Sequence, residues 1–261
     1  MRSLNIAASG MLAQQLNVEV ISNNIANMNT TGFKRQRAEF QDLLYQTEER
    51  VGSSSSDTGT IVPSGVQIGV GVKTAAVYRI SQQGNLTSTD NTYDVAIQGR
   101  GYFQITLPSG DTAYTRAGSF QLSPTGQIVT TDGYTVQPGI TIPPDAVSVT
   151  INASGEVLVK VDGQVATQNV GQLELATFPN DAGLEAKGDN LFLETPASGT
   201  ATTAVAGSPG VGTILQGFLE TSNVNVVQEI TNLITAQRAY EMNSKVIEAS
   251  DEMMRTLTSM R

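Results

Sequence analysis

The sequence predicts an α+β protein, with long N- and C-terminal helices forming a coiled-coil-like domain and a central antiparallel β-rich domain between them. Apolar residues recur every seven positions near both ends of the chain, which is the pattern of paired helices. Short alternating runs bounded by turn residues fill the middle, which is the pattern of antiparallel strands. The acidic excess also lies in residues 51–215, so the middle differs from the ends in charge.

The first helix is expected over residues 4–28. Its heptad positions are Leu4, Met11, Val18 and Ile25, with Ala7, Gln14, Ile21 and Met28 three residues further on. Asn29-Thr30-Thr31-Gly32 follows, and glycine is the usual residue just beyond a helix end. The stripe therefore predicts a helix that ends before Gly32.

The last helix is expected to begin after Asn225, a good N-cap residue with Gln228 three positions on. Its heptad positions are Val226, Leu233, Tyr240, Ile247 and Met254, and Ile230 is expected in the same seam. Together with Leu4, Met11, Val18, Ile21, Ile25 and Met28, these residues form the predicted assembly interface.

Both helices also carry apolar residues outside these series. The first helix adds Ile6, Leu12, Leu16 and Val20, and the last adds Met242, Val246, Met253 and Met260. Pairing the two helices with each other covers one side of each, and a helix that is apolar all round must be buried. The remaining side predicts contact with other copies of the chain, hence a homo-oligomer.

Four segments follow from these patterns. They are an N-terminal helix and following segment (1–45), an extended connection (46–75), a β-rich domain (76–215) and a C-terminal helical segment (216–261). Asp132-Gly133 and Asp162-Gly163 each lie between β-prone runs, where glycine supplies the positive φ of a tight hairpin turn. Four serines, Ser53 to Ser56, favour a flexible connection before the β-rich domain.

Composition excludes most catalytic chemistry. The 261 residues contain no Cys, His or Trp, so disulfides, thiolate or imidazole metal sites and Ser-His-Asp triads are excluded. The net charge of -9 argues against nucleic-acid binding. No stretch approaches the roughly 18 apolar residues of a membrane span, and no cleavable signal is evident. We expect no enzyme activity, no cofactor, no metal and no membrane insertion.

Two polar clusters have alternative interpretations. Lys34-Arg35-Gln36-Arg37 is interpreted as a solvated or interface face balanced by Glu39 and Asp42, rather than as a nucleic-acid site. Asp90 and Asp94 could form the carboxylate pair of a cell-wall hydrolase, although Asx turns between strands explain them more simply.

Several segments resemble the flagellar rod and hook family, the axial proteins of the bacterial flagellum. Residues 22–34 and 222–243 are similar to the terminal signatures of that family, and residues 98–103 and 114–120 are similar to its central β domain. The matching motif residues are Asn24, Asn27, Asn29, Thr30, Gly32, Phe33, Lys34, Ala236, Gln237, Arg238, Ala239 and Tyr240. The length and residues 33–45 resemble the distal-rod members most closely, and residues 63–69 also resemble them.

The resemblance implies a structural subunit of the distal rod, a helical tubular drive shaft that transmits torque from motor to hook. It implies export through the flagellar export apparatus without a cleaved signal, and a periplasmic location in the basal body. Implied partners are further copies of the chain, proximal rod and hook subunits, the rod cap and the surrounding rings. A proximal-rod or hook-type axial protein is the nearest alternative, and a periplasmic cell-wall hydrolase is a distant one.

Overall fold

The computed structural model describes residues 2–48, 65–164 and 166–260, and contacts divide the chain into two compact units. The helical unit comprises Met1–Ile25, Gln36–Tyr78 and Asn225–Arg261. The β unit comprises Ala26–Arg35 and Arg79–Val224. Each unit therefore contains segments that are far apart in the sequence.

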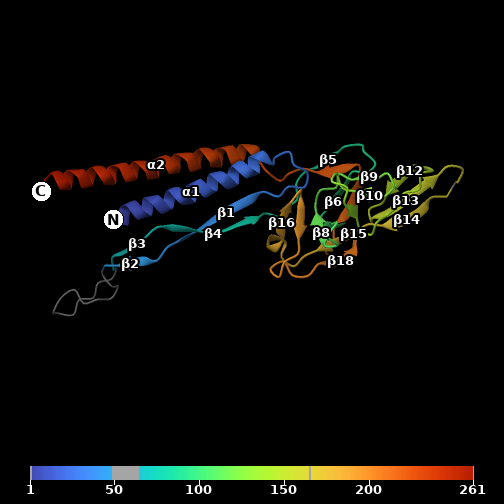
Figure 1. Cartoon of the computed structure of the whole chain (residues 1–261), viewed down its shortest axis with the longest axis horizontal. Helices are drawn as coiled ribbons and strands as arrows, with labels where there is room; N and C mark the ends of the chain where they lie inside the picture. The colour runs from blue at the N-terminus through green and yellow to red at the C-terminus, as the bar shows by residue number, and fades with distance from the viewer. Residues whose placement is uncertain (1, 49–64, 165, 261) are drawn as a thin grey trace. The chain divides into compact units, whose positions relative to one another are not determined.

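Two α-helices dominate the described residues of the helical unit. Helices α1 (Arg2–Ala26) and α2 (Val226–Ser259) lie side by side and antiparallel, as Figure 1 shows in blue and red. The Asn225 side chain accepts a hydrogen bond from the Gln228 backbone amide at 3.2 Å, so the predicted N-cap is confirmed. Neither helix is long and apolar enough to cross a membrane within the part of the chain that the structure describes.

Short strands complete the helical unit. Strand β1 (Gln36–Asp42) pairs with β4 (Val72–Arg79), and β2 (Tyr45–Thr47) pairs antiparallel with β3 (Gln67–Gly69). The Val72 amide donates to the Ser9 hydroxyl at 3.2 Å, which joins α1 to the start of β4. In the expected connection over 46–75, residues 49–64, including the four serines, lie outside the described residues.

The largest sheet of the β unit has nine strands in the described residues. Its order is β16-β17-β8-β7-β11-β10-β9, and β15 pairs with both β7 and β18. The strands are β7 (Tyr102–Thr106), β8 (Thr112–Thr115), β9 (Gln121–Leu122), β10 (Ile128–Val129), β11 (Thr135–Val136), β15 (Glu174–Thr177), β16 (Glu185–Gly188), β17 (Leu191–Leu193) and β18 (Thr202–Val205). Every pairing in this sheet is antiparallel.

Within its described residues, the β unit also contains three smaller groups of antiparallel strands. They are β12-β13-β14, β6 with β19, and β5 with β20. Their bounds are β5 (Leu86–Ser88), β6 (Val95–Gln98), β12 (Ala146–Ile151), β13 (Glu156–Val161), β14 (Gln168–Gln172), β19 (Thr213–Gln216) and β20 (Phe218–Glu220), and a 3-10 turn spans Asp181–Gly183. The predicted fold class is confirmed, since two terminal helices flank a central antiparallel β region.

Alternating strand residues build the core of the β unit. Ile97, Phe103 and Ile105 are fully buried, and the rings of Phe103 and Phe120 meet edge to face with centroids 5.1 Å apart. The glycines of the two predicted hairpins have the expected positive φ, but the turns are longer than two residues, since β10 ends at Val129 and β11 begins at Thr135, and β13 ends at Val161 and β14 begins at Gln168. Gly133 has a φ of 84° between β10 and β11, and Gly163 has a φ of 78° between β13 and β14.

Candidate functional site

The contact between α1 and α2 follows two heptad series of small and polar residues. On α1 the series is Ser3, Gly10, Asn17 and Asn24, and on α2 it is Glu229, Ala236, Asn243 and Ser250. We call these eight residues the polar seam. At one end the Ser3 and Ser250 hydroxyls lie 3.5 Å apart, and at the other Asn24 Nδ2 lies 3.2 Å from Glu229 Oε2. Adding a Cβ at Gly10 would bring it within 2.9 Å of the Asn243 amide, so the register is antiparallel and continuous.

Asn24 is the best-connected residue of the polar seam. It is 1% exposed, its Nδ2 donates to the Gln36 carbonyl at 2.8 Å, and its Oδ1 accepts from the Gln36 amide at 2.8 Å. The same Nδ2 reaches Glu229 on α2. One buried amide therefore ties together the end of α1, the start of β1 and the first turn of α2, which explains why the motif needs asparagine here.

The predicted interface residues flank the polar seam. Ile21 is buried; Leu4, Met11, Val18, Ile25, Val226, Leu233 and Ile247 are half-buried; and Met28, Ile230, Tyr240 and Met254 are exposed. The structure therefore brings most of this set to the margins of the contact between α1 and α2, while the polar seam occupies its centre. Sequence reasoning missed that seam because it followed the larger apolar side chains, although the polar series has the same seven-residue spacing.

Large apolar side chains remain exposed on α2. They are Val227, Ile230, Ile234, Met242, Val246, Met253, Met254, Leu257 and Met260. Met242 is 68% exposed and Met253 is 60% exposed. Exposed large apolar side chains in this number are typical of a helix that contacts another protein.

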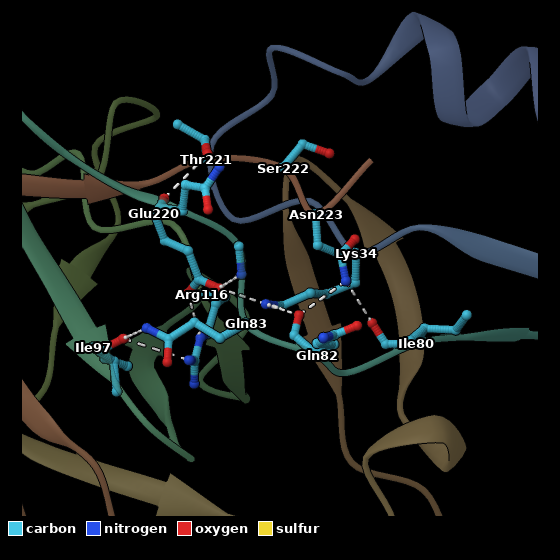
Figure 2. A network of polar contacts seen from close by, with 12 residues as sticks. Lys34, Ile80, Gln82, Gln83, Ile97, Arg116, Glu220, Thr221, Ser222 and Asn223 are labelled. Atoms are coloured by element: carbon cyan, nitrogen blue, oxygen red, sulfur yellow. Dashed lines mark hydrogen bonds and ion pairs between the residues drawn. The ribbon is translucent and has the colours of Figure 1, made fainter. Parts of the chain in front are cut away.

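The β unit holds a buried ion cluster, formed by Lys34, Arg116 and Glu220. Figure 2 shows the Glu220 carboxylate between the two cations, with Lys34 Nζ 2.5 Å from Oε1 and Arg116 Nε 2.6 Å from Oε2. All three side chains are at most 6% exposed. Glu220 Oε1 also accepts from the Gly84 amide at 2.9 Å.

Backbone carbonyls satisfy the remaining donors of this cluster. Lys34 Nζ donates to the Gln82 carbonyl at 3.0 Å, and Arg116 donates to the Gly99 and Gly101 carbonyls, each at 2.5 Å. Nearby, Asn223 Nδ2 donates to the Ile80 and Gln82 carbonyls at 3.0 and 2.9 Å (Figure 2). A buried ion cluster is stable only when its remaining hydrogen-bond donors also have partners.

Burial and charge act in opposite directions on the pKa values of the ion cluster. Burial lowers the pKa of Lys34, and the Glu220 carboxylate opposes that effect only in part. Burial acts to raise the pKa of Glu220, but Arg116 and Lys34 together outweigh it and lower that pKa below its usual value. Glu220 is therefore held as a carboxylate.

The prediction for the basic cluster at 34–37 is wrong at Lys34. Lys34 is not solvated but 5% exposed, because the carboxylate that neutralises it comes from β20, far away in the sequence. Arg37 agrees with the prediction, since it is solvated and lies 2.7 Å from Glu39. Sequence reasoning missed Arg116, which directly follows β8, and Glu220, which ends β20, because an isolated charged residue at a strand end carries no local signal of such pairing.

The other motif residues have structural roles of their own. Gly32 has a φ of 68°, and a Cβ there would lie 2.8 Å from the Arg116 backbone. Asn27 Oδ1 accepts from the Thr30 hydroxyl at 3.1 Å in the turn after α1. Asn29, Gln237, Arg238 and Tyr240 are exposed, Phe33 and Ala239 are half-buried, and Ala236 is buried.

Asp90 and Asp94 lie in the connection between β5 and β6 and make local hydrogen bonds. Asp94 is 7% exposed and accepts hydrogen bonds from the Thr89 hydroxyl at 2.6 Å and from the side-chain Nδ2 of Asn91 at 3.0 Å. Asp90 has a φ of 55° and accepts from the Ser88 hydroxyl at 3.1 Å. Both carboxylates therefore bind neighbouring side chains of the connection between β5 and β6.

Family comparisons match both units. Residues 4–34 match "Flagella basal body rod protein", residues 96–159 match "Flagellar hook protein FlgE/F/G D1 domain", and residues 215–260 match "Flagellar basal body rod FlgEFG protein C-terminal". These matches contain the ion cluster and every residue of the polar seam except Ser3, and together they cover more than half of the chain.

Curated relatives match from end to end. The chain is 66% identical over 261 residues to "Flagellar basal-body rod protein FlgG" of Caulobacter vibrioides, with both chains fully covered. The chain belongs to the flagellar basal-body rod protein family. Relatives with the same name from Agrobacterium fabrum and Borreliella burgdorferi are 55% and 49% identical, with at least 96% of each chain covered. The resemblance inferred from the terminal motifs of this rod family member is confirmed.

Proposed function

We propose that this rod family member is a structural subunit of the distal rod of the flagellar basal body. Copies assemble into a helical tube, which acts as a drive shaft that carries torque from the motor to the hook. The observation that carries the proposal is an antiparallel helix pair that leaves large apolar side chains exposed on α2, in a chain 66% identical over its full length to a named rod protein.

The helical unit supplies the contacts between copies. Polar and small residues fill the contact between α1 and α2, so apolar faces remain for neighbouring subunits. The predicted interface residues, including Leu233, Tyr240 and Ile247, flank that contact. Burial of such faces between copies at interior packing density gives a stiff polymer. Contacts between different surfaces of identical subunits extend without closing, which produces a filament.

The remaining roles follow from this position. Proximal rod subunits, hook subunits, the rod cap and the surrounding rings would contact the assembled tube in the periplasm, and the export apparatus would deliver the chain without signal cleavage. In the four-segment division predicted from the sequence, the segment after α1 (to residue 45) and the extended connection (46–75) would join the terminal helices to the β-rich domain (76–215). A proximal-rod or hook-type role is less favoured, because the full-length relatives at 66% and 55% identity are named FlgG. Hydrolase activity is also less favoured, since Asp90 and Asp94 are engaged in a turn.

The test uses a Caulobacter vibrioides strain that lacks its own 66% identical relative. We expect the chain to restore swimming, and immunogold labelling of purified basal bodies to place it on the rod between the proximal segment and the hook. Restored swimming with label on the proximal segment or the hook would overturn the distal-rod assignment, as would export without any restored swimming.

A single substitution separates assembly from folding. Ile247 is half-buried beside the polar seam, so Ile247→Asp places a carboxylate in the proposed interface. We expect cells that do not swim, truncated rods and normal export, because an unpaired buried charge is strongly unfavourable. The control is Glu248→Gln, which alters an exposed neighbour and should swim normally. Normal rods from Ile247→Asp would place the interface elsewhere.

A further inference from the structure

A small cavity in the β unit adjoins the ion cluster. Its volume is about 210 Å³, which is below the roughly 300–1,000 Å³ of sites for drug-sized ligands. Its charged and hydroxyl-bearing lining residues are Lys34, Ser81, Arg100, Tyr102, Arg116 and Asp181, and all of them belong to the β unit. The cavity therefore has room for a small polar group, and we call it the cationic cavity.

The buried charges beside the cationic cavity do not balance. Lys34 and Arg116 share the single carboxylate of Glu220 (Figure 2), and no other carboxylate in the described part of the chain lies within ion-pair distance of either cation. The carbonyl groups that bind the two cations satisfy hydrogen bonds but supply no negative charge. One excess positive charge therefore remains on side chains that are at most 6% exposed. Buried charges in proteins are normally paired.

The neighbouring charged residues do not remove this excess. Arg100 Nη2 lies 3.9 Å from Asp181 Oδ2, so these two charges offset each other. The charged residues that line the cationic cavity, together with Glu220, are three cations and two carboxylates. The Arg100 side chain is 65% exposed, whereas Lys34 and Arg116 are buried, so the cavity extends from solvent to the ion cluster.

Both buried cations also have an N–H group to spare. Every nitrogen of their charged groups has a partner, but the Lys34 ammonium carries three N–H groups and binds only Glu220 and the Gln82 carbonyl. The Arg116 guanidinium carries five N–H groups and makes four hydrogen bonds, one to Glu220 and three to backbone carbonyls. One N–H group of each cation therefore has no acceptor among the described residues.

Hydrogen bonds hold the wall of the cationic cavity in place. Gln83 Nε2 donates to the Ile97 carbonyl at 2.9 Å (Figure 2), and Gln83 Oε1 accepts from the Gly99 amide at 3.0 Å. Gly99 and Gly101 have φ values of 112° and 138°, which favour glycine. These conformations let both carbonyls bind Arg116. The cavity is therefore preformed, as sites for small ligands usually are.

We propose that the cationic cavity binds a single carboxylate group, which acts as the second counter-ion of Lys34 and Arg116. This inference goes beyond the proposed function and does not depend on it. One oxygen would accept from Lys34 and the other from Arg116, which repeats the arrangement that the Glu220 carboxylate makes with the same two cations. One negative charge equals the excess of the cluster. A phosphate dianion would exceed it and would also be repelled by the Asp181 carboxylate on the lining.

The protonation states of the lining residues suit this ligand. Burial raises the pKa of Tyr102 to about 12, so its hydroxyl keeps its proton at neutral pH and can donate to an anion. Burial is also the main cause that lowers the pKa of Lys34, and the charge of Arg116 adds to that effect. A second carboxylate beside Lys34 would stabilise its charged form.

Nuclear magnetic resonance of the full-length chain labelled with ¹⁵N tests the site. Sodium acetate replaces sodium chloride at constant ionic strength and neutral pH. We expect saturable shifts of the backbone amides of Ser81, Gly99, Arg100 and Gly101, and no such shifts with acetamide, which is uncharged and similar in shape. The absence of saturable shifts with acetate, equal shifts with acetamide, or tighter binding of phosphate than of acetate would overturn the proposal.

Two substitutions remove the excess charge in different ways. Lys34→Met leaves Glu220 paired with Arg116 alone, and Ser81→Asp supplies a carboxylate from an exposed lining residue. We expect each to weaken acetate binding at least tenfold, and Ser81→Asp keeps the test decisive if Lys34→Met does not fold. The matched control is Lys160→Gln, which removes an exposed cation of β13 and should bind acetate as the natural chain does. Undiminished binding by either folded variant would overturn the proposal.

Two capped tripeptides then identify the source of the carboxylate. They are acetyl-Gly-Glu-Gly-amide and its glutamine counterpart, which differ only in the charged group. Binding of the glutamate peptide at least as tight as that of acetate supports a carboxylate from a polypeptide side chain, and weaker binding supports a free small carboxylate. Equal binding of the glutamine peptide would overturn carboxylate recognition. None of these outcomes changes the expected swimming and rod labelling, so the proposed function is tested separately.

Discussion

Lys34 Nζ lies 2.5 Å from Glu220 Oε1, although 186 positions separate the two residues in the sequence. Lys34 follows α1, and Glu220 ends β20 shortly before α2 begins. The Gly32 amide also donates to the Glu220 carbonyl at 2.8 Å, and the Asn223 side chain accepts from the Arg35 amide at 2.7 Å. The ion cluster therefore holds the segment entering the β unit against the segment leaving it.

Removing the carboxylate should destabilise the β unit strongly. Glu220→Gln leaves Lys34 and Arg116 buried without a counter-charge, which typically lowers the free energy of unfolding by about 3–5 kcal/mol. Urea unfolding followed by circular dichroism measures this change. Glu39→Gln is the control, because it removes an ion pair that is about half exposed at both ends and should leave stability unchanged. Equal stability of both variants would show that the ion cluster contributes little.

Acid should weaken the same contact. The folded-state pKa of Glu220 lies below the usual 4.5, because Arg116 and Lys34 outweigh burial. At pH values between the folded-state pKa of Glu220 and 4.5, the unfolded chain therefore binds more protons than the folded protein. This contribution to stability is fully present above about pH 5 and is lost as the pH falls through the folded-state pKa. Unfolding free energies measured from pH 6 to pH 3 should fall less steeply in Glu220→Gln than in the natural chain; parallel curves would contradict this assignment.

Alkali should act on the β unit through Tyr102. Burial is the main cause that raises the pKa of Tyr102 to about 12. Between pH 10 and 12 the folded protein retains a proton that the unfolded chain releases, so stability falls as the pH rises above 10. The full effect is about 2–3 kcal/mol. Tyr102→Phe should flatten this alkaline loss in urea titrations, and an unchanged slope would assign the loss to other groups.

The sequence predicted those structural elements that depend on residues close together in the chain. The Asn225 N-cap, the turn glycines Gly133 and Gly163 and the heptad helices all depend on residues within one or two turns of each other, so the sequence displays them directly. The buried state of Lys34 depends on Glu220 and Arg116, which reach it only through the strand pairings of the β unit. The same holds for β1 and β4, whose pairing joins residues on either side of 49–64.

The centre of the helix contact was missed for a different reason. A heptad is normally recognised from its large apolar residues, whereas Gly10, Asn17 and Asn24 are small or polar. Yet small residues allow close approach, and a buried asparagine specifies register at some expense of stability. The polar seam thus sets the pairing of α1 with α2, and the apolar residues at its margins remain available for other contacts.

Close approach at Gly10 should be required for this pairing. A Cβ at this position would lie 2.9 Å from the Asn243 amide, so Gly10→Leu must push the helices apart or displace Asn243. Overpacking of this kind typically costs about 1–3 kcal/mol. We expect faster backbone hydrogen exchange in both helices of the full-length chain. Ala8→Leu is the matched control, because Ala8 is exposed on the same helix and the added side chain meets solvent. Adding Asn243→Ala to Gly10→Leu should return part of the lost protection, because it removes the amide that the leucine displaces. Equal exchange in the Gly10 and Ala8 variants would mean that the helices do not approach through the polar seam.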